Sequence, residues 1–216
     1  MGPGSRGTVT GQPYSLVETT TSVRTLSDGT TMTNVEQNNC MRDAEGRVRI
    51  EVGHQHNGTM QFDMVDIVDP VAKERINLMV GKKTARVMQI PEWKSSGALD
   101  KGARFAAGGT NRPGFVAPTV VKLGGQMVAG VYAEGTRTTR VIPVGKEGND
   151  HEIQSVTETW ISPDLKIVVG RTTSDPRFGT TTTVVTNLTR SDPAASLFQV
   201  PSDYTVVAPR HLGQGQ

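Results

Sequence analysis

The sequence lacks the residues that build disulfide-bonded, zinc-binding or membrane-spanning proteins. It has one cysteine among 216 residues, which excludes an internal disulfide framework and any zinc site that needs two or more thiolates. No apolar run approaches the ~20 residues that a membrane-spanning helix requires. These absences favour a soluble domain, or two, because ~150 residues is typical of one domain.

An excess of one charge is missing as well. The 23 Lys and Arg residues against 21 Asp and Glu residues give a net charge of +2. Because nucleic-acid-binding domains usually combine a basic face with a pI above ~9, this balance argues against a nucleic-acid partner. The sequence also contains no Rossmann, P-loop or Gly-x-Ser-x-Gly fingerprint, so we expect no cofactor.

Threonine and valine are what the sequence has in abundance. There are 27 Thr and 26 Val residues, which together make up about a quarter of the chain. Their β-branched side chains are stiff at χ1 and suit a pleated surface better than a helix. The composition therefore predicts an all-β protein.

Turn signals divide the chain into short segments of β-rich sequence. Asp28-Gly29 and Asn57-Gly58 are typical of tight hairpins. Gly124-Gly125 separates two further predicted strands. Because neither face of 14–26 and 31–41 is strongly apolar, we expect this pair at a sheet edge. The predicted strands are 14–26, 31–41, 47–55, 59–68, 75–80, 84–90, 119–123, 127–132, 134–141, 151–161, 166–173, 180–188 and 204–207.

Helical signals are short. One short helix is expected near 96–105, and one helical turn near 192–198, where Asp192 would cap and Pro193 would take the first position. The predicted organisation is one β-rich domain over 13–208. It consists of a meander over 13–90, an irregular crossing over 91–114 and a second set of strands over 115–208, between a flexible lead at 1–12 and a flexible tail at 209–216.

Several short motifs lie in the second half of the chain, over about 120–206. They are Gly130-Val131, Glu134-Gly135-Thr136-Arg137-Thr138-Thr139, Ile142-Pro143, Gly148-Asn149, Glu158-Thr159-Trp160, Ser162-Pro163, Asp175-Pro176-Arg177-Phe178-Gly179, Leu197-Phe198, Val200-Pro201 and Tyr204. These motifs resemble those of a family of uncharacterised bacterial envelope proteins. Such proteins usually carry a signal peptide, and 1–12 has no apolar region of that kind.

The order of elements is similar to that of the LolA-like half-barrel, the fold of lipoprotein carriers. That resemblance implies a large curved antiparallel sheet, a half-barrel or open barrel, whose concave face holds acyl chains under short helices. It supplies no active-site motif. Together the two resemblances imply a periplasmic or secreted protein whose start has been trimmed, and a cytoplasmic protein is the alternative.

Methionines mark the most suggestive region. Met60, Met64, Met79 and Met88 fall on two consecutive predicted hairpins, and flexible thioethers suit surfaces that receive varied apolar ligands or fill irregular cores. Along 59–68, the residues Met60, Phe62 and Met64 alternate with polar ones, so we expect them on one face, with the period shifting near Met64 at a β-bulge. The candidate ligand-binding residues are Met60, Phe62, Met64, Trp93 and Phe105.

Signals for metal or acid–base chemistry are weaker. His54 and His56 lie on one side of a predicted strand, but the spacing of a third and fourth ligand is missing, which favours an exposed strand end. Carboxylates on the polar faces of strands are more often solubilising groups that protect sheet edges. No catalytic residue is therefore predicted. The carboxylates that could converge in an acid–base site are Asp63, Asp66, Glu134, Glu152 and Glu158.

Two non-enzymatic functions follow, and a metal-dependent or carboxylate enzyme is the third alternative. In the first, an envelope protein binds an apolar small molecule or a lipidated partner on the concave face of its sheet. In the second, Thr-rich strands with few charges associate with a neighbouring sheet edge, and the chain is a structural or assembly subunit.

Overall fold

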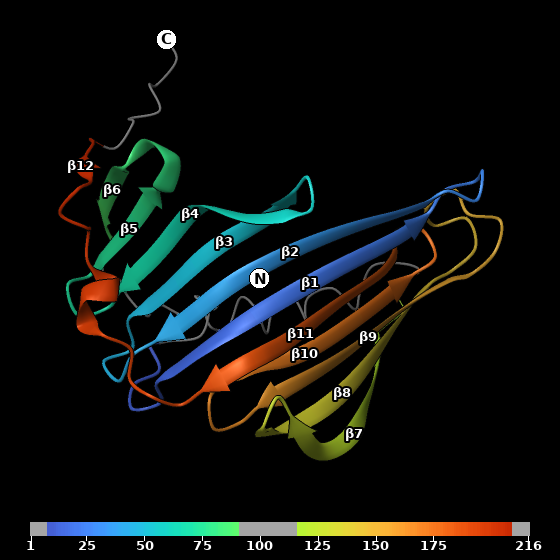
Figure 1. Cartoon of the computed structure of the whole chain (residues 1–216). Coiled ribbons are helices and arrows are strands. Elements are labelled where there is room, and N and C mark those ends of the chain that lie inside the picture. The colour runs from blue at the N-terminus through green and yellow to red at the C-terminus, as the bar shows by residue number, and fades with distance from the viewer. Residues whose placement is uncertain (1–7, 91–115, 209–216) are drawn as a thin grey trace, which may run out of the picture. The chain divides into compact units, whose positions relative to one another are not determined.

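The computed structural model describes residues 8–90 and 116–208. The expected helix near 96–105, together with Trp93 and Phe105, lies outside the described residues. Strands make up most of what is described (Figure 1). They are β1 (Tyr14–Thr25), β2 (Thr31–Arg42), β3 (Val48–His56), β4 (Thr59–Asp69), β5 (Glu74–Met79), β6 (Thr84–Gln89), β7 (Thr119–Val128), β8 (Val131–Ile142), β9 (Ile153–Ser162), β10 (Ile167–Asp175), β11 (Gly179–Thr189) and β12 (Thr205–Val206), with the short 3₁₀-helices η1 (Val80–Lys82) and η2 (Ala195–Phe198).

The strands form one open sheet. Its order is β12-β6-β5-β4-β3-β2-β1-β11-β10-β9-β8-β7, so two meanders meet where β1 lies beside β11 (Figure 1). The two-residue β12 pairs parallel with β6, whereas the pairings from β2 to β6 and from β7 to β11 are antiparallel. The predicted fold class, an all-β chain with a large open antiparallel sheet, is confirmed. No helix among the described residues has the length and apolar character to span a membrane.

The hairpin predicted at Asn57-Gly58 is confirmed. Both residues have positive φ, 48° and 79°, as a two-residue type I′ turn requires. The turn predicted at Gly124-Gly125 is wrong, because β7 runs through both glycines and turns at Ala129-Gly130, where φ is 51° and 81°. Gly124 instead accompanies a register shift between Lys122 and itself.

Gly125 has a packing role inside β7. A Cβ on Gly125 would lie 2.1 Å from the hydroxyl oxygen of Tyr132, so the missing side chain leaves room for the tyrosine ring. Gly124 thus lies at a bulge and Gly125 allows a close contact. The sequence alone does not distinguish these two roles from a turn.

The expectation that the first two strands lie at a sheet edge is also wrong. β1 and β2 are in the middle of the strand order. Their polar side chains bond to neighbouring strands instead of water: Asn38 donates to Glu18 at 3.3 Å, and the hydroxyls of Thr20 and Thr183 lie 2.9 Å apart. Hydrogen bonds between cross-strand side chains make polar strands compatible with a central position.

Contacts divide the chain into two compact units. Unit 1 comprises Met1–Thr19, Val35–Glu92 and Val185–Gln216, and unit 2 comprises Thr20–Asn34 and Trp93–Val184. The single domain over 13–208 stays a prediction.

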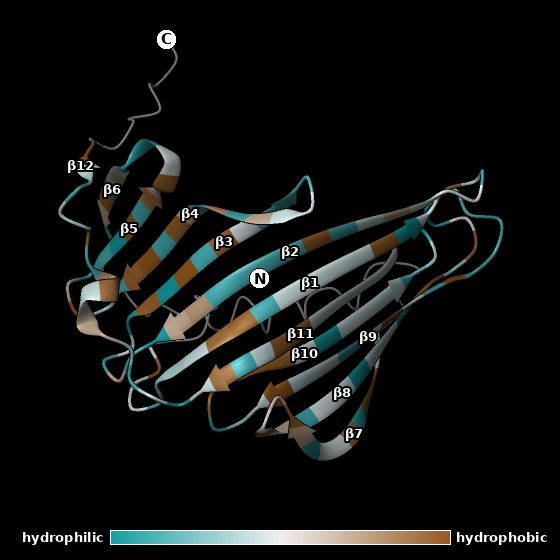
Figure 2. Ribbon diagram, in the orientation of Figure 1, coloured by the Kyte–Doolittle hydropathy of each residue, from teal (hydrophilic) through white to brown (hydrophobic). Residues whose placement is uncertain are grey.

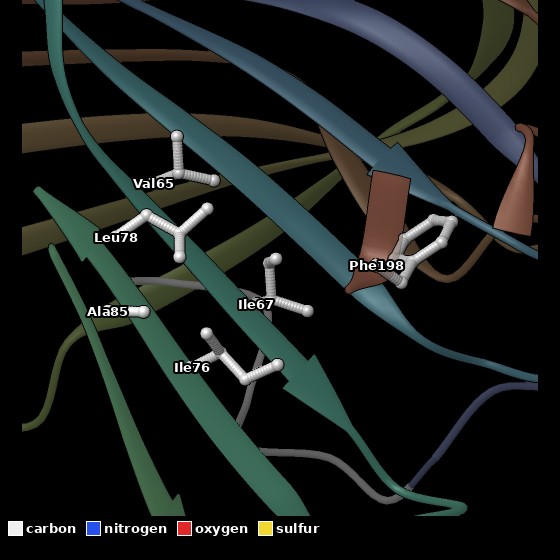
Figure 3. Close-up of a cluster of buried hydrophobic side chains, with 6 residues drawn as sticks. All are labelled: Val65, Ile67, Ile76, Leu78, Ala85 and Phe198. Atoms are coloured by element: carbon white, nitrogen blue, oxygen red, sulfur yellow. The ribbon is translucent and has the colours of Figure 1, made fainter. Parts of the chain in front are cut away.

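Unit 1 has an apolar core on one face of its strands. The register places Val65 opposite Leu78, and Leu78 opposite Ala85, so these side chains form one row across β4, β5 and β6. A second row lies beside it, and Phe198 from η2 covers the cluster and is 1% exposed (Figure 3). We call this the core face. Its buried residues are Val65, Ile67, Ile76, Leu78, Ala85 and Phe198.

The N-cap of η2 differs from the one expected from the sequence. Ala194, not Asp192, is the N-cap residue of η2, and it makes no side-chain cap bond. The Asp192 carboxylate instead accepts a 3.0 Å hydrogen bond from the backbone N–H of Ala44. Arg49 donates to the carbonyl of Leu197 at 2.9 Å, so one hydrogen bond before η2 and one within it hold this segment to β3 and the turn before β3.

In unit 2, a tryptophan lies between two glycines. The register pairs Trp160 with Gly135 on β8 and with Gly170 on β10. A Cβ on Gly135 would approach the indole to 2.6 Å, so the ring lies over a position where any other residue would collide with it. An aromatic ring over a strand glycine shields backbone that would otherwise be exposed to solvent.

An ion pair fixes the turn between β10 and β11. The buried Asp175 carboxylate accepts hydrogen bonds from Arg177 at its backbone N–H (3.0 Å), its Nε (2.9 Å) and its Nη2 (2.8 Å). The hydrogen bonds from the Arg177 side chain are the main reason that the pKa of Asp175 is lowered to about 2. Arg177 also pairs with Glu147.

Asp175→Asn is expected to lower the free energy of unfolding by about 1–3 kcal/mol at pH 7, since it weakens bonds to a buried charged acceptor. The native pKa lies below its ordinary 3.8, so this stabilisation is present above about pH 4 and is lost as the pH falls toward 2. Urea denaturation of both proteins between pH 7 and pH 2.5 measures it. Asp63→Asn, at an exposed position on β4, is the control. A loss of stability that is the same at pH 7 and pH 2.5 would contradict the assignment.

Candidate functional site

The face of unit 1 opposite the core carries a second apolar surface. Val52 on β3 pairs with Met64 on β4, and Met64 pairs with Met79 on β5. Met64 and Met79 remain 39% and 42% exposed. We call this surface the methionine face. Its apolar residues are Val48, Ile50, Val52, Met64, Val68, Met79 and Met88.

Alternation along the strands of unit 1 separates these two faces. On β4 and β5 hydrophobic and hydrophilic bands alternate (Figure 2). Val65, beside Met64 in the chain, lies in the core, while Met64 points to the other side, as successive residues of a strand do. Because the core face and the methionine face both hold apolar side chains, the sheet of unit 1 has apolar residues on both sides.

A bulge separates the predicted site residues of β4. Met64 pairs with Val52 but Phe62 pairs with the next residue, Gly53, so Asp63 is an extra residue in β4. Positions 52 and 53 face opposite sides of β3. The expectation that Met60, Phe62 and Met64 share one face is therefore wrong, because the extra residue shifts the alternation between Phe62 and Met64.

Phe62 has a structural neighbour on its own side. A Cβ on Gly53 would lie 2.7 Å from Cε1 of the Phe62 ring, so the ring lies over the glycine. Met60 pairs with Gln55, two positions along β3 from Gly53, and so stays on the same side as Phe62. Of the candidate residues in the described part of the chain, only Met64 belongs to the methionine face. Met79 lies beside Met64 on the methionine face, because the antiparallel register of β4 and β5 pairs these two residues.

Polar groups beside the methionine row are bound to one another. Asp66, one row along from Met64, accepts hydrogen bonds from Arg75 at 2.6 and 2.8 Å and from Asn77 at 2.6 Å. The hydrogen bond to Asp66 raises the pKa of Arg75. The methionine face therefore has, beside its methionines, a carboxylate that is already paired with an arginine and an asparagine, and not a free reactive carboxylate.

The other carboxylates considered from the sequence have no common centre within either unit. In unit 2, Glu158 pairs with Arg137 at 2.6 Å, and Glu152 accepts a hydrogen bond from Gln154 at 2.9 Å. Glu134 is exposed on β8, and in unit 1 Asp63 is exposed on β4. Nothing in these positions assigns acid–base chemistry to the chain.

His54 and His56 lie at the turn end of the β3–β4 hairpin. His54 pairs with Gln61 and His56 with Thr59, next to the turn, and both imidazoles are exposed. In 8–90 and 116–208, no group of three or more His, Cys, Asp or Glu residues is arranged to hold a metal ion.

The single cysteine is a buried thiol. Burial raises the pKa of Cys40 to about 12, with a smaller contribution from Glu18. Burial also raises the pKa of Tyr14 to about 12, while Arg42 lies 4.7 Å above its ring. A thiol with so high a pKa has almost no thiolate at neutral pH, so Cys40 is not a nucleophile in the folded chain.

A small hollow in unit 2 was not foreseen from the sequence. Its volume is about 260 Å³, slightly below the ~300–1,000 Å³ of typical small-molecule pockets. Arg177, one of its two arginines, is already bound to Asp175. The hollow is lined by Val23, Arg24, Thr25, Pro176, Arg177, Gly179 and Thr180.

No family model and no curated protein matches the chain, whereas solved structures match over most of its length. MucB of Pseudomonas aeruginosa, in a complex with MucA, is 14% identical with a TM-score of 0.39 over 90% of this chain and 58% of that one. Lipoprotein LppX of Mycobacterium tuberculosis is 10% identical with a TM-score of 0.34, over 85% of this chain and 90% of that one. A LolA-superfamily protein, NE2245 from Nitrosomonas europaea, is 5% identical with a TM-score of 0.35, over 88% of this chain and 90% of that one. The chain thus spans less than two thirds of the MucB chain.

Proposed function

We propose that the chain is a non-enzymatic protein of the bacterial envelope that binds an apolar ligand, or the lipid of a lipidated partner, on the methionine face of unit 1. We propose further that this is the concave face of the sheet. The observation that carries the proposal is the paired Met64 and Met79, both exposed beside Val52 although the core already occupies the opposite face. The envelope location rests on the motifs over 120–206.

Burial of hydrocarbon would drive binding. Each Å² of apolar surface removed from water contributes about 25 cal/mol. An acyl chain lying along the methionine face would bury apolar surface of its own and of the methionine side chains. Met side chains have three rotatable bonds and a polarisable sulfur, so they adapt to chains of different shape. The Asp66–Arg75 pair beside the row limits the apolar strip on one side.

The double variant Met64→Glu/Met79→Glu is expected to weaken binding of a fluorescent fatty acid at least tenfold, because two charges would have to be desolvated against the alkyl chain. Fluorescence titration of the full chain measures the dissociation constant. Met32→Glu is the matched control, since Met32 is also an exposed methionine (56%), on β2 in unit 2. Wild-type protein that takes up none of the probe, or a double variant that binds as wild type does, would refute the proposal.

The sheet edge favours a second candidate, a structural subunit. β7 ends the strand order and is ten residues long, and its Val120, Val121 and Met127 are exposed, the last by 66%. An edge strand presents unpaired N–H and C=O groups that can pair with another chain. At the other end of the order, β12 has only two residues.

If β7 mediates assembly, Val120→Lys/Met127→Lys will reduce the particle size measured by light scattering at high protein concentration, because edge lysines oppose strand pairing. Asn34→Lys, at an exposed position on the central strand β2, is the control and should leave the size unchanged. Wild-type protein that stays monomeric at high concentration would exclude this candidate.

A further inference from the structure

One face of unit 2 is covered with hydroxyl groups in register. Thr136 on β8 pairs with Thr159 on β9, and Thr159 pairs with Arg171 on β10. Arg171 pairs with Thr183 on β11, whose hydroxyl bonds to that of Thr20. We call these five residues the arginine row.

A second row of hydroxyls lies beside the arginine row. Its neighbouring side chains are already paired, since the hydroxyls of Thr157 and Thr173 lie 3.2 Å apart and those of Ser22 and Thr181 lie 3.1 Å apart. A hydroxyl has one hydrogen to donate, so two hydroxyls that share one bond leave one donor unused. The row consists of Ser22, Thr138, Thr157, Thr173 and Thr181.

Arg171 is the one charged residue among these ten, none of which is a carboxylate, and Lys122 on β7 lies opposite Thr136 where the arginine row continues. Two other arginines of unit 2, Arg137 on β8 and Arg177 in the turn after β10, pair with carboxylates. The Nε of Arg171, in contrast, is buried and has no hydrogen-bond partner among residues 8–90 and 116–208. Leaving a buried donor unsatisfied is costly, more so when the group is charged, so its presence calls for a partner that these residues do not supply.

We infer that Arg171 and the hydroxyls beside it form a binding site for an oxyanion, a carboxylate or phosphate group. A guanidinium presents its N–H groups in a planar fork that matches two oxygens of such a group. Thr159 and Thr183 lie directly across from Arg171 on the two neighbouring strands, where cross-strand Cβ atoms are ~4.5–5.5 Å apart. Their hydroxyls can donate to further lone pairs of these two oxygens, or to a third oxygen when the group is a phosphate. The anion is either a free ion or the head of an amphiphile, and the site belongs to unit 2, so it does not rest on the methionine face.

The test compares three probes on the full chain by isothermal titration calorimetry: inorganic phosphate, octanoate and neutral 1-octanol. Wild type is expected to bind phosphate, or to bind octanoate at least tenfold more tightly than 1-octanol. Arg171→Gln should abolish phosphate binding and remove the preference for octanoate, while Arg171→Lys, which keeps the charge but loses the fork, should retain part of it. Arg140→Gln is the matched control, because Arg140 is exposed on the same face of β8 as Thr136 and Thr138.

Phosphate binding that requires Arg171 would identify a free-ion site, and an octanoate preference without phosphate binding would identify the head of an amphiphile. Either result supports the inference. The inference is overturned if wild type does not bind phosphate and binds octanoate no more tightly than 1-octanol. It is also overturned if Arg171→Gln and Arg171→Lys both fold and both bind the anions as tightly as wild type does. Binding of 1-octanol that is lost in Met64→Glu/Met79→Glu tests the methionine face separately, so failure of one proposal is distinguishable from failure of the other.

Discussion

Phe198→Ala is expected to lower the free energy of unfolding of unit 1 by about 3–5 kcal/mol, the usual cost of removing a buried phenyl group. The ring is 1% exposed and packs against the core of β4 and β5 (Figure 3). The Arg47 guanidinium lies 5.4 Å from the centre of the ring. Urea denaturation gives the loss, and hydrogen exchange should show reduced protection of the backbone amides in β4 and β5.

Phe178→Ala is the matched control. Phe178 is 67% exposed in the turn of unit 2, so the same substitution there removes little buried surface and is expected to cost less than about 1 kcal/mol. Equal losses for the two variants would show that Phe198 does not complete the core of unit 1.

Gly179→Ala should destabilise unit 2 by about 2 kcal/mol or more, combining backbone strain with a collision. Gly179 has a φ of +88°, and a Cβ there would lie 2.1 Å from the carbonyl oxygen of Val23 and 3.0 Å from the Cα of Arg24. Both atoms belong to the backbone, so no rotamer change relieves the contact, and β1 and β11 would have to separate locally. Thermal unfolding followed by tryptophan fluorescence, to which Trp160 of unit 2 contributes, measures the effect.

Gly29→Ala separates the two causes. Gly29 has a φ of +85° in the same unit, but a Cβ there would meet no atom within 4 Å. It should therefore show only the cost of the left-handed conformation, about 1 kcal/mol. A Gly179→Ala variant no less stable than Gly29→Ala would contradict the close approach of Val23 to Gly179.

Strand positions in this chain are largely readable from local sequence. The β-branched residues and the turn at Asn57-Gly58 predict β3 and β4 almost to the residue, because both signals act within a few residues of the chain. Gly124-Gly125 misleads for the same reason. A glycine pair is compatible with a turn or with a bulge beside a tyrosine ring, and Tyr132 on the paired strand β8 decides which.

The candidate site was only partly predictable. Methionines on two hairpins indicate an adaptable apolar surface, and Met64 and Met79 do lie together on it. The face occupied by Phe62 depends on one extra residue in β4, which shifts the alternation. Arg171 gave no signal in the sequence, because the threonines that surround it come from four other strands.

Composition and short-range pattern by themselves determined that this protein is all-β and where most strands begin and end. Only the tertiary structure decided that β1 and β2 are central, that Phe198 closes the core of unit 1, and which side chains share a face. The physical reason is that turns and strand propensity depend on neighbours in sequence, whereas strand order, burial and cross-strand pairing depend on residues that only folding brings together.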